Sequence, residues 1–324
     1  MRYRTLGHSG LKLSVIGLGS WLTYGNTVDD GTTRSVVLRA WERGINFIDT
    51  ANIYAKGAAE IALAPVLREL KRDALVLATK VYFPMGDTVN EHGLSRKHIR
   101  DQAHHSLKRL GVEYIDLYQC HRYDDTTPLE ETCEAMNDLI RAGHVLYWGV
   151  SEWNADQIAA VVTLCRARGW AVPISNQPQY SALYRRIEAR VLPASERYGI
   201  GNVVWSPIAM GILTGKYTDA KRPPADSRGA GSEAQWMEDY MTQPILDAVQ
   251  KLKPVAEKAG CTLGQLALAW TLREPAVTSA IVGATKLSHV DENAAAADLD
   301  IDPSLFDEVN RILEPVTPHD PILA

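Results

Sequence analysis

Residues 75–120 contain, in order, the run Leu75-Val-Leu-Ala-Thr-Lys80, the segment Ser95-Arg-Lys-His-Ile-Arg-Asp-Gln-Ala-His-His-Ser-Leu-Lys-Arg-Leu-Gly111 and the run Tyr114-Ile-Asp-Leu-Tyr-Gln-Cys120. The two short runs are nearly continuous in apolar and β-branched residues, which predicts strands buried on both faces of a parallel sheet. The middle segment begins with a serine suited to a helix N-cap and ends with a glycine suited to a helix C-terminus. Residues 75–120 are therefore predicted to form one strand–helix–strand unit.

The same alternation runs through the whole chain. Eight runs predict strands: Leu13–Leu18, Asn46–Asp49, Leu75–Lys80, Tyr114–Cys120, Tyr147–Ser151, Pro173–Gln177, Asn202–Ser206 and Ser279–Gly283. The segments between them predict helices, among them Thr32–Arg43, Ala58–Lys71, a helix with Pro128 at its first position, a helix between Asn154 and Gly169, Leu263–Arg273 and Pro303–Leu313. Eight such units predict a (β/α)8 TIM barrel that forms one domain over residues 1–324. A doubly wound open sheet is the alternative fold.

Two segments depart from this repeat. Gly7-His-Ser-Gly10 lies between two short β-like runs, which predicts an N-terminal β-hairpin at the bottom of the barrel. The connection between the seventh and eighth strand runs is much longer than the others, and its stretch 221–232 is rich in glycine, proline and charge. This composition predicts a long surface loop after the seventh strand, and such loops are usually functional or disordered.

Composition and charge narrow the class of protein. Hydrophobic residues make up 46% and charged residues 23% of the 324 residues, as in ordinary globular proteins. The net charge is −5, from 34 Lys and Arg against 39 Asp and Glu. Because there is no basic excess, nucleic acid is not expected as a partner. The basic pairs Arg96–Lys97 and Lys108–Arg109 are expected to lie on solvated helix faces.

The cysteines and the N-terminus favour a cytoplasmic protein. Cys120, Cys133, Cys165 and Cys261 are widely spaced, which favours reduced thiols over a disulfide framework or a zinc site. The first ten residues lack the apolar run of a signal peptide. The longest uncharged, apolar-leaning stretch, 199–215, contains a proline and four glycines. We expect it to form a strand and its turn, and we expect no membrane insertion.

Polar side chains follow the ends of the predicted strands, where barrels of this type carry their active sites. Asp49, Lys80 and His121 stand at the ends of the second, third and fourth strands, and Tyr54 follows Asp49 in the loop. The later strand ends carry Ser151-Glu152, Asn176-Gln177, Trp205-Ser206-Pro207 and Gly283-Ala-Thr285. We therefore expect these groups to converge on one rim of the barrel.

Four of these residues suit proton delivery to a carbonyl group. A buried Lys80 needs a counter-charge, which Asp49 can supply. An ammonium beside a phenol stabilises the phenolate, so the pKa of Tyr54 is expected to fall from about 10 toward neutrality. Tyr54 would then donate a proton near neutral pH, while a neutral His121 would donate a hydrogen bond to the carbonyl oxygen. The set predicts protonation of a carbonyl that receives a hydride.

Eight motifs surround these residues, in order, over nearly the whole chain. They are Phe47-Ile-Asp-Thr-Ala-Asn-Ile-Tyr54, Ala78-Thr-Lys80, Tyr114-Ile-Asp-Leu-Tyr-Gln-Cys-His121, Gly149-Val-Ser-Glu-Trp153, Asn176-Gln-Pro-Gln-Tyr180, Trp205-Ser-Pro-Ile-Ala-Met-Gly211, Thr214-Gly-Lys-Tyr217 and Val282-Gly-Ala-Thr285 with Glu292-Asn293. Together they resemble the aldo-keto reductase superfamily. Gly17-Leu-Gly-Ser-Trp21, Leu94-Ser-Arg-Lys-His-Ile99 and Tyr147-Trp-Gly-Val-Ser-Glu-Trp153 resemble the branch that holds the potassium-channel β-subunits and their microbial relatives.

The resemblance implies an NADPH-dependent oxidoreductase that reduces aldehydes or ketones to alcohols. It implies that Asp49, Tyr54, Lys80 and His121 are the catalytic tetrad, with Tyr54 as the general acid. It implies cofactor contacts at Trp21, Ser151, Glu152, Gln177, Trp205, Ser206, Pro207, Ile208, Gly211, Leu213, Gly215, Lys216, Arg228, Gly283, Thr285, His289, Glu292 and Asn293. Within this set, Ser151 and Gln177 match residues that bind the nicotinamide carboxamide, and Trp205 matches the aromatic residue that stacks on the nicotinamide ring. Glu152 stands where many members carry Asn.

The same resemblance favours NADPH over NADH. Lys216, Lys286 and Arg228 supply positive charge for the adenosine 2′-phosphate. His289 stands where relatives often have Arg or Gln, so use of NADH is the alternative. No metal-ligand spacing occurs at the strand ends, and no metal is expected. His98, His104 and His105 are expected to be surface histidines on an outer helix.

Two other functions compete with the reductase. One is a regulatory protein like a potassium-channel β-subunit, which binds NADPH and reports redox state to a channel. The intact tetrad favours the reductase, because some channel-subunit relatives carry Asn at the position of His121, and so does the lack of a long N-terminal extension. The other is a metal-dependent hydrolase on the same fold, which the absence of ligand-spaced His and Asp disfavours.

Substrate choice is expected to depend on the loops. Trp21 and Tyr82 are expected to wall the substrate pocket, and the loops after Gly19, Lys80 and His121, with the tail Pro315–Ala324, are expected to set specificity. The expected partner is a small carbonyl compound. A homo-oligomer, a tetramer by analogy with channel-subunit relatives, is a further expectation.

Overall fold

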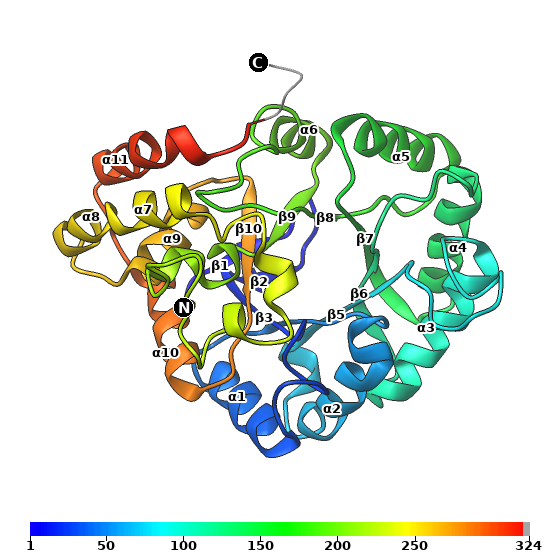
Figure 1. Ribbon diagram of the computed structural model, residues 1–324. Helices are drawn as coiled ribbons and strands as arrows, with labels where there is room; N and C mark the ends of the chain where they lie inside the picture. The colour runs from blue at the N-terminus through cyan, green and yellow to red at the C-terminus, as the bar shows by residue number, and fades with distance from the viewer. Residues whose placement is uncertain (320–324) are drawn as a thin grey trace.

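A closed barrel of eight parallel strands forms the centre of the molecule in the computed structural model, which describes residues 1–319 (Figure 1). The strands are β3 (Ile16–Gly19), β4 (Phe47–Asp49), β5 (Val76–Val81), β6 (Ile115–Cys120), β7 (Val145–Ser151), β8 (Ser175–Gln177), β9 (Gly201–Trp205) and β10 (Val277–Val282). They pair in chain order, and the ring closes where Ala280 of β10 lies opposite Ile16 of β3. The predicted (β/α)8 barrel is confirmed, and the open sheet is excluded.

Helices follow the strands and surround the barrel (Figure 1). They are α1 (Asp30–Glu42), α2 (Ala58–Leu67), α3 (Arg96–Leu110), α4 (Leu129–Arg141), α5 (Ala155–Arg168), α6 (Val191–Tyr198), α7 (Gln243–Gln250), α8 (Lys253–Lys258), α9 (Leu263–Leu272), α10 (Leu287–Ala295) and α11 (Pro303–Leu313). The 3-10 helices are η1 (Tyr54–Gly57), η2 (Arg72–Ala74), η3 (Ala209–Thr214), η4 (Arg228–Ala230), η5 (Ala234–Met237), η6 (Ala296–Asp298) and η7 (Glu314–Val316). No helix of residues 1–319 combines the length and apolarity needed to cross a membrane.

The helix ends follow the chemistry of their terminal residues. The Ser95 side chain accepts a hydrogen bond from the backbone N–H of His98 at the start of α3, and Gly111 takes the left-handed conformation at its end. Asn154 caps α5 in the same way. Pro128 is the N-cap of α4, one position before the helix, and not its first residue as predicted.

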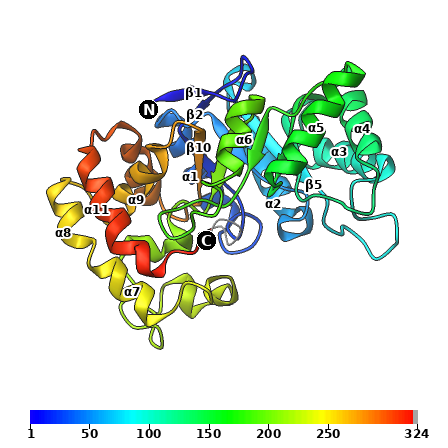
Figure 2. The same cartoon turned by 90° about the horizontal axis from the view of Figure 1, so that it is seen from above.

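The N-terminal hairpin closes the bottom of the barrel. Strands β1 (Tyr3–Thr5) and β2 (Lys12–Ser14) pair antiparallel, and Leu6 and Leu13 are fully buried with the side chains that fill the barrel interior. A Cβ on Gly7, whose φ is +54°, would lie 2.4 Å from the carbonyl oxygen of Gly199, so this turn requires glycine. Figure 2 shows the hairpin at the opposite end of the molecule from α7. The predicted strand 13–18 is thus divided between β2 and β3.

The long connection between β9 and β10 contains more structure than the sequence predicted. It holds η3, η4, η5, α7, α8 and the predicted α9. The short helices α7 and α8 were missed, although Pro244 and Pro254 lie in their first turns, where proline is favoured. The stretch 221–232 does lie in a segment of bends, turns and one 3-10 turn between these elements.

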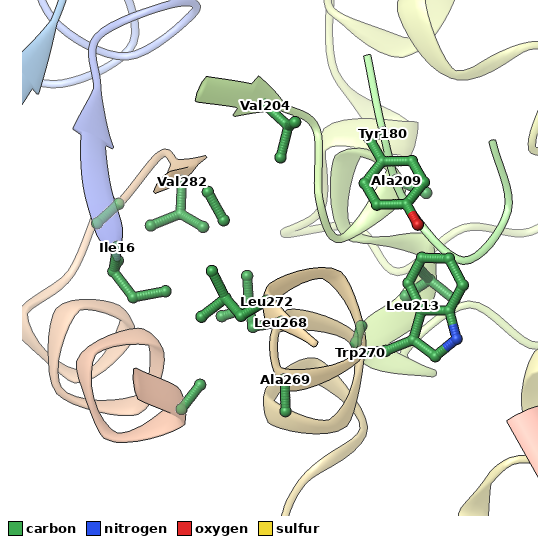
Figure 3. Close-up of a cluster of buried hydrophobic side chains, with 14 of the residues drawn as sticks. Ile16, Tyr180, Val204, Ala209, Leu213, Leu268, Ala269, Trp270, Leu272 and Val282 are labelled. Carbon is green, nitrogen blue, oxygen red and sulfur yellow. The ribbon is translucent and has the colours of Figure 1, made fainter. Parts of the chain in front are cut away.

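Helix α9 packs its apolar face against the outside of the barrel. In Figure 3, Ile16, Val204 and Val282 of three neighbouring strands face Leu268 and Leu272 of α9. All five side chains are at most 3% exposed. Removal of this apolar area from water stabilises the packing of α9 on the barrel.

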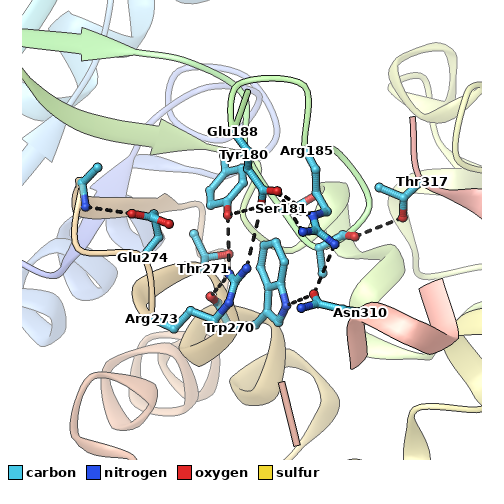
Figure 4. Close-up of polar contacts among 12 residues, drawn as sticks. Tyr180, Ser181, Arg185, Glu188, Trp270, Thr271, Arg273, Glu274, Asn310 and Thr317 are labelled. Atoms are coloured by element: carbon cyan, nitrogen blue, oxygen red, sulfur yellow. Dashed lines mark hydrogen bonds and ion pairs between the residues drawn. The ribbon is translucent and has the colours of Figure 1, made fainter. Parts of the chain in front are cut away.

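A polar cluster ties α9 to α11 and to the loop after β8 (Figure 4). The Arg273 guanidinium lies 3.6 Å from the centre of the Trp270 ring, whose indole N–H donates to Asn310 Oδ1 at 2.8 Å. Arg185 Nη2 donates to Glu188 Oε2 at 2.8 Å. Arg185 Nη1 also donates to Asn310 Oδ1 at 3.3 Å, so two hydrogen bonds to Asn310, one of them charged, fix α11 against α9 and the loop after β8.

Two predictions about the surface of α3 are wrong. His98 is 1% exposed, because it shares the barrel-facing side of α3 with Gln102 and Ser106; His104 and His105 are exposed as expected. Arg109 is only partly solvated, because its Nε donates to the buried carboxylate of Glu60 at 2.6 Å. Helical periodicity places residues four apart on one face, and this face points inward.

Candidate active site

The four predicted tetrad residues meet at one rim of the barrel. Asp49 ends β4, Lys80 lies near the end of β5, His121 follows β6 and Tyr54 begins η1. Lys80 Nζ donates to Asp49 Oδ2 at 2.6 Å, to the Thr50 carbonyl oxygen at 2.8 Å and to the Tyr54 hydroxyl at 3.2 Å. Lys80 is fully buried and Asp49 is 2% exposed. The ammonium thus links a carboxylate and a phenol away from solvent.

The turn that presents Tyr54 has an unusual backbone. Ala55 and Lys56, directly after Tyr54, have φ values of 47° and 50°, in the left-handed region that residues with a Cβ rarely adopt. Such strain persists only where the surrounding structure enforces it, and it is frequent at functional sites. The turn follows directly on Tyr54, whose ring centre lies 4.9 Å from Lys80 Nζ.

The charge of Lys80 is stabilised by its partners. Burial lowers the pKa of Lys80, but the attraction of Asp49 and of Tyr54 and the hydrogen bonds to both outweigh it, so the net pKa is raised. The other oxygen of Asp49, Oδ1, accepts a hydrogen bond from Gln177 Nε2 at 2.9 Å. Lys80 is therefore a charged ammonium group. Its counter-ion, Asp49, is also held by Gln177 of β8.

The expected fall in the pKa of Tyr54 is not found. Burial raises the pKa of Tyr54 above its ordinary value, and the Lys80 ammonium opposes this without reversing it. The Lys80 cation alone would lower this pKa, but the phenol has lost the solvent that would stabilise its charged form. At neutral pH Tyr54 consequently keeps its proton.

His121 is neutral and lies against Tyr54. The two rings are in edge contact with centroids 5.7 Å apart, and the imidazole is 7% exposed. Burial, followed by the charges of Lys80 and Arg122, holds the pKa of His121 well below its ordinary value. A neutral imidazole retains one N–H, which can donate to an oxygen placed beside the Tyr54 hydroxyl.

A second group of predicted residues lies at the ends of β7, β8 and β9. Ser151 Oγ donates to the Gln177 carbonyl oxygen at 2.9 Å. The indole N–H of Trp205 donates to Glu152 Oε1 at 2.6 Å, and the backbone N–H of Gln179 donates to the same oxygen at 2.6 Å. The link between Glu152 and Trp205, which are far apart in sequence, was not predicted.

Aromatic rings extend from Trp205 toward solvent. Trp21, after β3, makes edge contacts with Trp205 at 6.3 Å and with Trp236 of η5 at 5.3 Å between ring centroids. Trp236 is 48% exposed. Trp236 was not predicted at the site; the only signal for it in the sequence is a tryptophan that follows a polar, glycine-rich segment. On another side, the rings of Phe83 and His121 are in edge contact with centroids 4.9 Å apart, and Tyr82 packs on Phe83 in turn.

The remaining predicted cofactor residues follow two neighbouring strands. Ser206, Pro207, Ile208, Gly211, Leu213, Gly215 and Lys216 follow β9, and Gly283, Thr285, His289, Glu292 and Asn293 follow β10. Arg228 lies in η4 of the long connection. Burial lowers the pKa of His289, and the positive charges of Lys286 and Lys216 lower it further. Both ammonium groups therefore lie near this imidazole. The Glu292 carboxylate accepts a hydrogen bond at 2.6 Å from the hydroxyl of Thr262, the residue that caps the start of α9.

Residues 15–314 match the sequence model described as the Aldo/keto reductase family. The chain belongs to the aldo/keto reductase family. It is 40% identical over 326 residues to an Arabidopsis thaliana protein named "Probable voltage-gated potassium channel subunit beta", with 97% of each chain covered. A protein of the same name from Oryza sativa subsp. japonica is 40% identical over 331 residues, covering 99% of this chain and 98% of its own. A Schizosaccharomyces pombe (strain 972 / ATCC 24843) protein named "Putative voltage-gated potassium channel subunit beta" is 40% identical over 321 residues, covering 96% of this chain and 93% of its own.

These matches confirm the predicted family and branch, and they support an oxidoreductase. No group of three or more His, Cys, Asp or Glu that could hold a metal ion occurs within residues 1–319 of this aldo/keto reductase. Its four cysteines are free thiols, and Cys120 beside the tetrad is fully buried. Residues 320–324 of the tail expected to affect specificity lie outside the described residues.

Proposed function

We propose that the protein reduces aldehydes or ketones to alcohols with NADPH, and that Tyr54 is the general acid. The observation that carries the proposal is the triple contact of Lys80 Nζ with Asp49, the Thr50 carbonyl and the Tyr54 hydroxyl. A buried ammonium that touches a phenol is expensive to maintain for stability alone. When bound, the cofactor supplies the hydride; the residues of the chain supply the proton and the orientation.

Tyr54 delivers the proton in this proposal. Its raised pKa keeps the hydroxyl protonated at neutral pH, so the acid form is present before the reaction. Lys80 then stabilises the phenolate that remains, because an ammonium at 3.2 Å favours the charged form. Asp49 keeps Lys80 charged. General acid catalysis of this kind contributes roughly 10²–10⁴-fold in rate.

His121 orients the carbonyl. A neutral imidazole donates a hydrogen bond to the carbonyl oxygen without competing for the proton of Tyr54. Its edge contact with the Tyr54 ring, at 5.7 Å between centroids, lets both groups reach one oxygen atom. Phe83 on one side and Trp21 with Trp236 on another would exclude water and contact the apolar part of the substrate.

The chain fits a phosphorylated dinucleotide. Lys216, Lys286 and Arg228 take part in none of the ion pairs of residues 1–319, so these cations are available to phosphate groups. A surface cavity of about 430 Å³ lies beside Lys286, between the starts of α1 and α10. We place the adenosine end of NADPH near these cations, with use of NADH as the alternative.

The test is oxidation of NADPH by a panel of aldehydes and ketones, repeated with NADH. We expect turnover of at least one carbonyl compound and tighter binding of NADPH than of NADH. Tyr54→Phe should lose turnover by roughly 10²–10⁴-fold while its affinity for NADPH stays nearly unchanged. A Tyr54→Phe protein with the kcat of the wild type would show that another group delivers the proton.

The names of the relatives favour a second candidate function. A cytoplasmic regulatory subunit of a potassium channel, tetrameric by analogy, would bind NADPH without needing turnover. The two functions are separated by the same panel: tight binding of NADPH with no oxidation by any carbonyl compound, together with capture of a channel, would favour the subunit.

A further inference from the structure

Two carboxylates lie at the proposed nicotinamide end, and only one of them forms a direct ion pair. Asp49 forms an ion pair with Lys80 at 2.6 Å. Glu152 forms no ion pair with any Lys, Arg or His of residues 1–319; its Oε1 accepts only N–H groups, from the Trp205 indole and from the Gln179 backbone, each at 2.6 Å. The carboxylate of Glu152 therefore has no direct ion-pair partner beside the Trp205 ring. Arg186, which together with Glu152 influences the phenols of Tyr184 and Tyr240, lies over the Tyr184 ring and does not bond to Glu152.

The backbone enforces this arrangement. Glu152 directly follows Ser151, the last residue of β7, and has a φ of +58°, a conformation that residues with a Cβ rarely adopt. The two short hydrogen bonds converge on one oxygen and fix both the carboxylate and the indole. A neutral amide of the same length could accept the same two hydrogen bonds. The hydrogen bonds alone therefore do not explain a charge at this position.

We propose that Glu152 sets the preference of the site between oxidised and reduced cofactor. The inference rests on the proposed function, in which Trp205 stacks on the nicotinamide ring. That ring carries a positive charge when oxidised and none when reduced, so a nearby carboxylate attracts the oxidised form selectively. The hydrogen bond from the indole N–H to the carboxylate also makes the face of the Trp205 ring more negative, and a cation prefers such a face.

The consequence is a bound couple that gives up hydride more readily. A residue that binds the oxidised form more tightly than the reduced form lowers the reduction potential of the bound couple, because binding and redox equilibria are linked. For one charge acting across an indole ring in a partly buried site, we expect a selective effect of about five- to tenfold on affinity. Glu152 also positions Trp205, whose indole N–H it holds, and so acts on the cofactor partly through that ring.

The experiment measures the dissociation constants of NADP⁺ and NADPH by tryptophan fluorescence titration of the full chain. Glu152→Gln should keep both hydrogen bonds and remove the charge, so the ratio Kd(NADP⁺)/Kd(NADPH) should rise about five- to tenfold, mostly through weaker binding of NADP⁺. Glu152→Asp retains the charge and should keep the ratio within about twofold of the wild type. Glu238→Gln, on the exposed surface after η5, is the matched control and should leave the ratio unchanged.

Three outcomes would overturn the inference. An unchanged ratio in Glu152→Gln, with both cofactors still bound, would show that the charge has no selective effect. An equal change of the ratio in Glu152→Gln and Glu152→Asp would show that side-chain geometry is responsible. Failure of the wild type to bind either cofactor would refute the proposed function and this inference together.

Discussion

Replacement of Lys80 by methionine tests whether the buried ammonium is structural, catalytic or both. The substitution removes the hydrogen bonds to Asp49, the Thr50 carbonyl and Tyr54, and it leaves Asp49 with an amide donor from Gln177 at 2.9 Å. Loss of one partner of a buried ion pair costs roughly 3–5 kcal/mol, because an uncompensated charge is left in a poorly solvated place. We expect the free energy of unfolding to fall by about this amount.

The same substitution should also change the chemistry. Without the ammonium, the pKa of Tyr54 rises further, because burial then acts with little opposition. The acid form of Tyr54 is lost as pH rises through this pKa, so the alkaline limb of the kcat profile should move to higher pH. Turnover at neutral pH should fall, because the phenolate left after proton transfer is no longer stabilised.

The assay combines urea unfolding, followed by circular dichroism, with a pH profile of kcat on the same sample. The matched variant Lys80→Met/Asp49→Asn removes both charges and should regain part of the lost stability without regaining turnover. A folded Lys80→Met protein with unaltered kcat and an unaltered pH profile would refute the tetrad assignment and favour the regulatory function.

Three further predictions concern cofactor binding by Lys286, the protonation of His121 and the contact of Trp236 with the substrate. Lys286→Ala should weaken binding of NADPH about tenfold and binding of NADH much less, since only NADPH carries the extra phosphate; equal losses in fluorescence titrations would contradict this. Because the folded-state pKa of His121 is depressed, its contribution to stability is present above the unfolded pKa of about 6.5 and is lost as pH falls below it. When the free energy of unfolding is measured in urea and plotted against pH, His121→Asn should show a slope below pH 6.5 that is smaller than that of the wild type by about 1.4 kcal/mol per pH unit. An unchanged slope of this plot would contradict a buried neutral imidazole. Trp236→Ala should raise KM for apolar carbonyl substrates about three- to tenfold with little change in kcat, and a KM that is unaltered across the panel would remove Trp236 from the pocket.

Much of the fold could be read from the sequence because the barrel strands are buried on both faces. Such strands need nearly continuous apolar runs, and all eight runs contain or overlap a barrel strand. The helix Pro303–Leu313 has its predicted bounds, since proline and a periodic apolar face mark it. Helices α7 and α8 have only 8 and 6 residues, too few to repeat a periodic pattern, and they were missed.

The site was only partly predictable, for a different reason. Residues at strand ends converge because the barrel forces them to, so the meeting of Asp49, Lys80 and His121 followed from their positions. Loop residues have no such constraint, and nothing in the sequence indicated that Trp236 would contact Trp21. The pKa of Tyr54 depends on how much solvent remains around the phenol, which only the packed structure shows.

The order of the strands along the chain has a consequence for biosynthesis. All four tetrad residues lie within residues 49–121, whereas the cations expected to hold the phosphates of the cofactor begin at residue 216, and β10 must pair with β3 to close the ring. A ribosome therefore releases the acid–base residues long before the strand that closes the ring. Until residue 282 has emerged, β3 has a free edge, and the incomplete barrel must avoid pairing that edge with another chain.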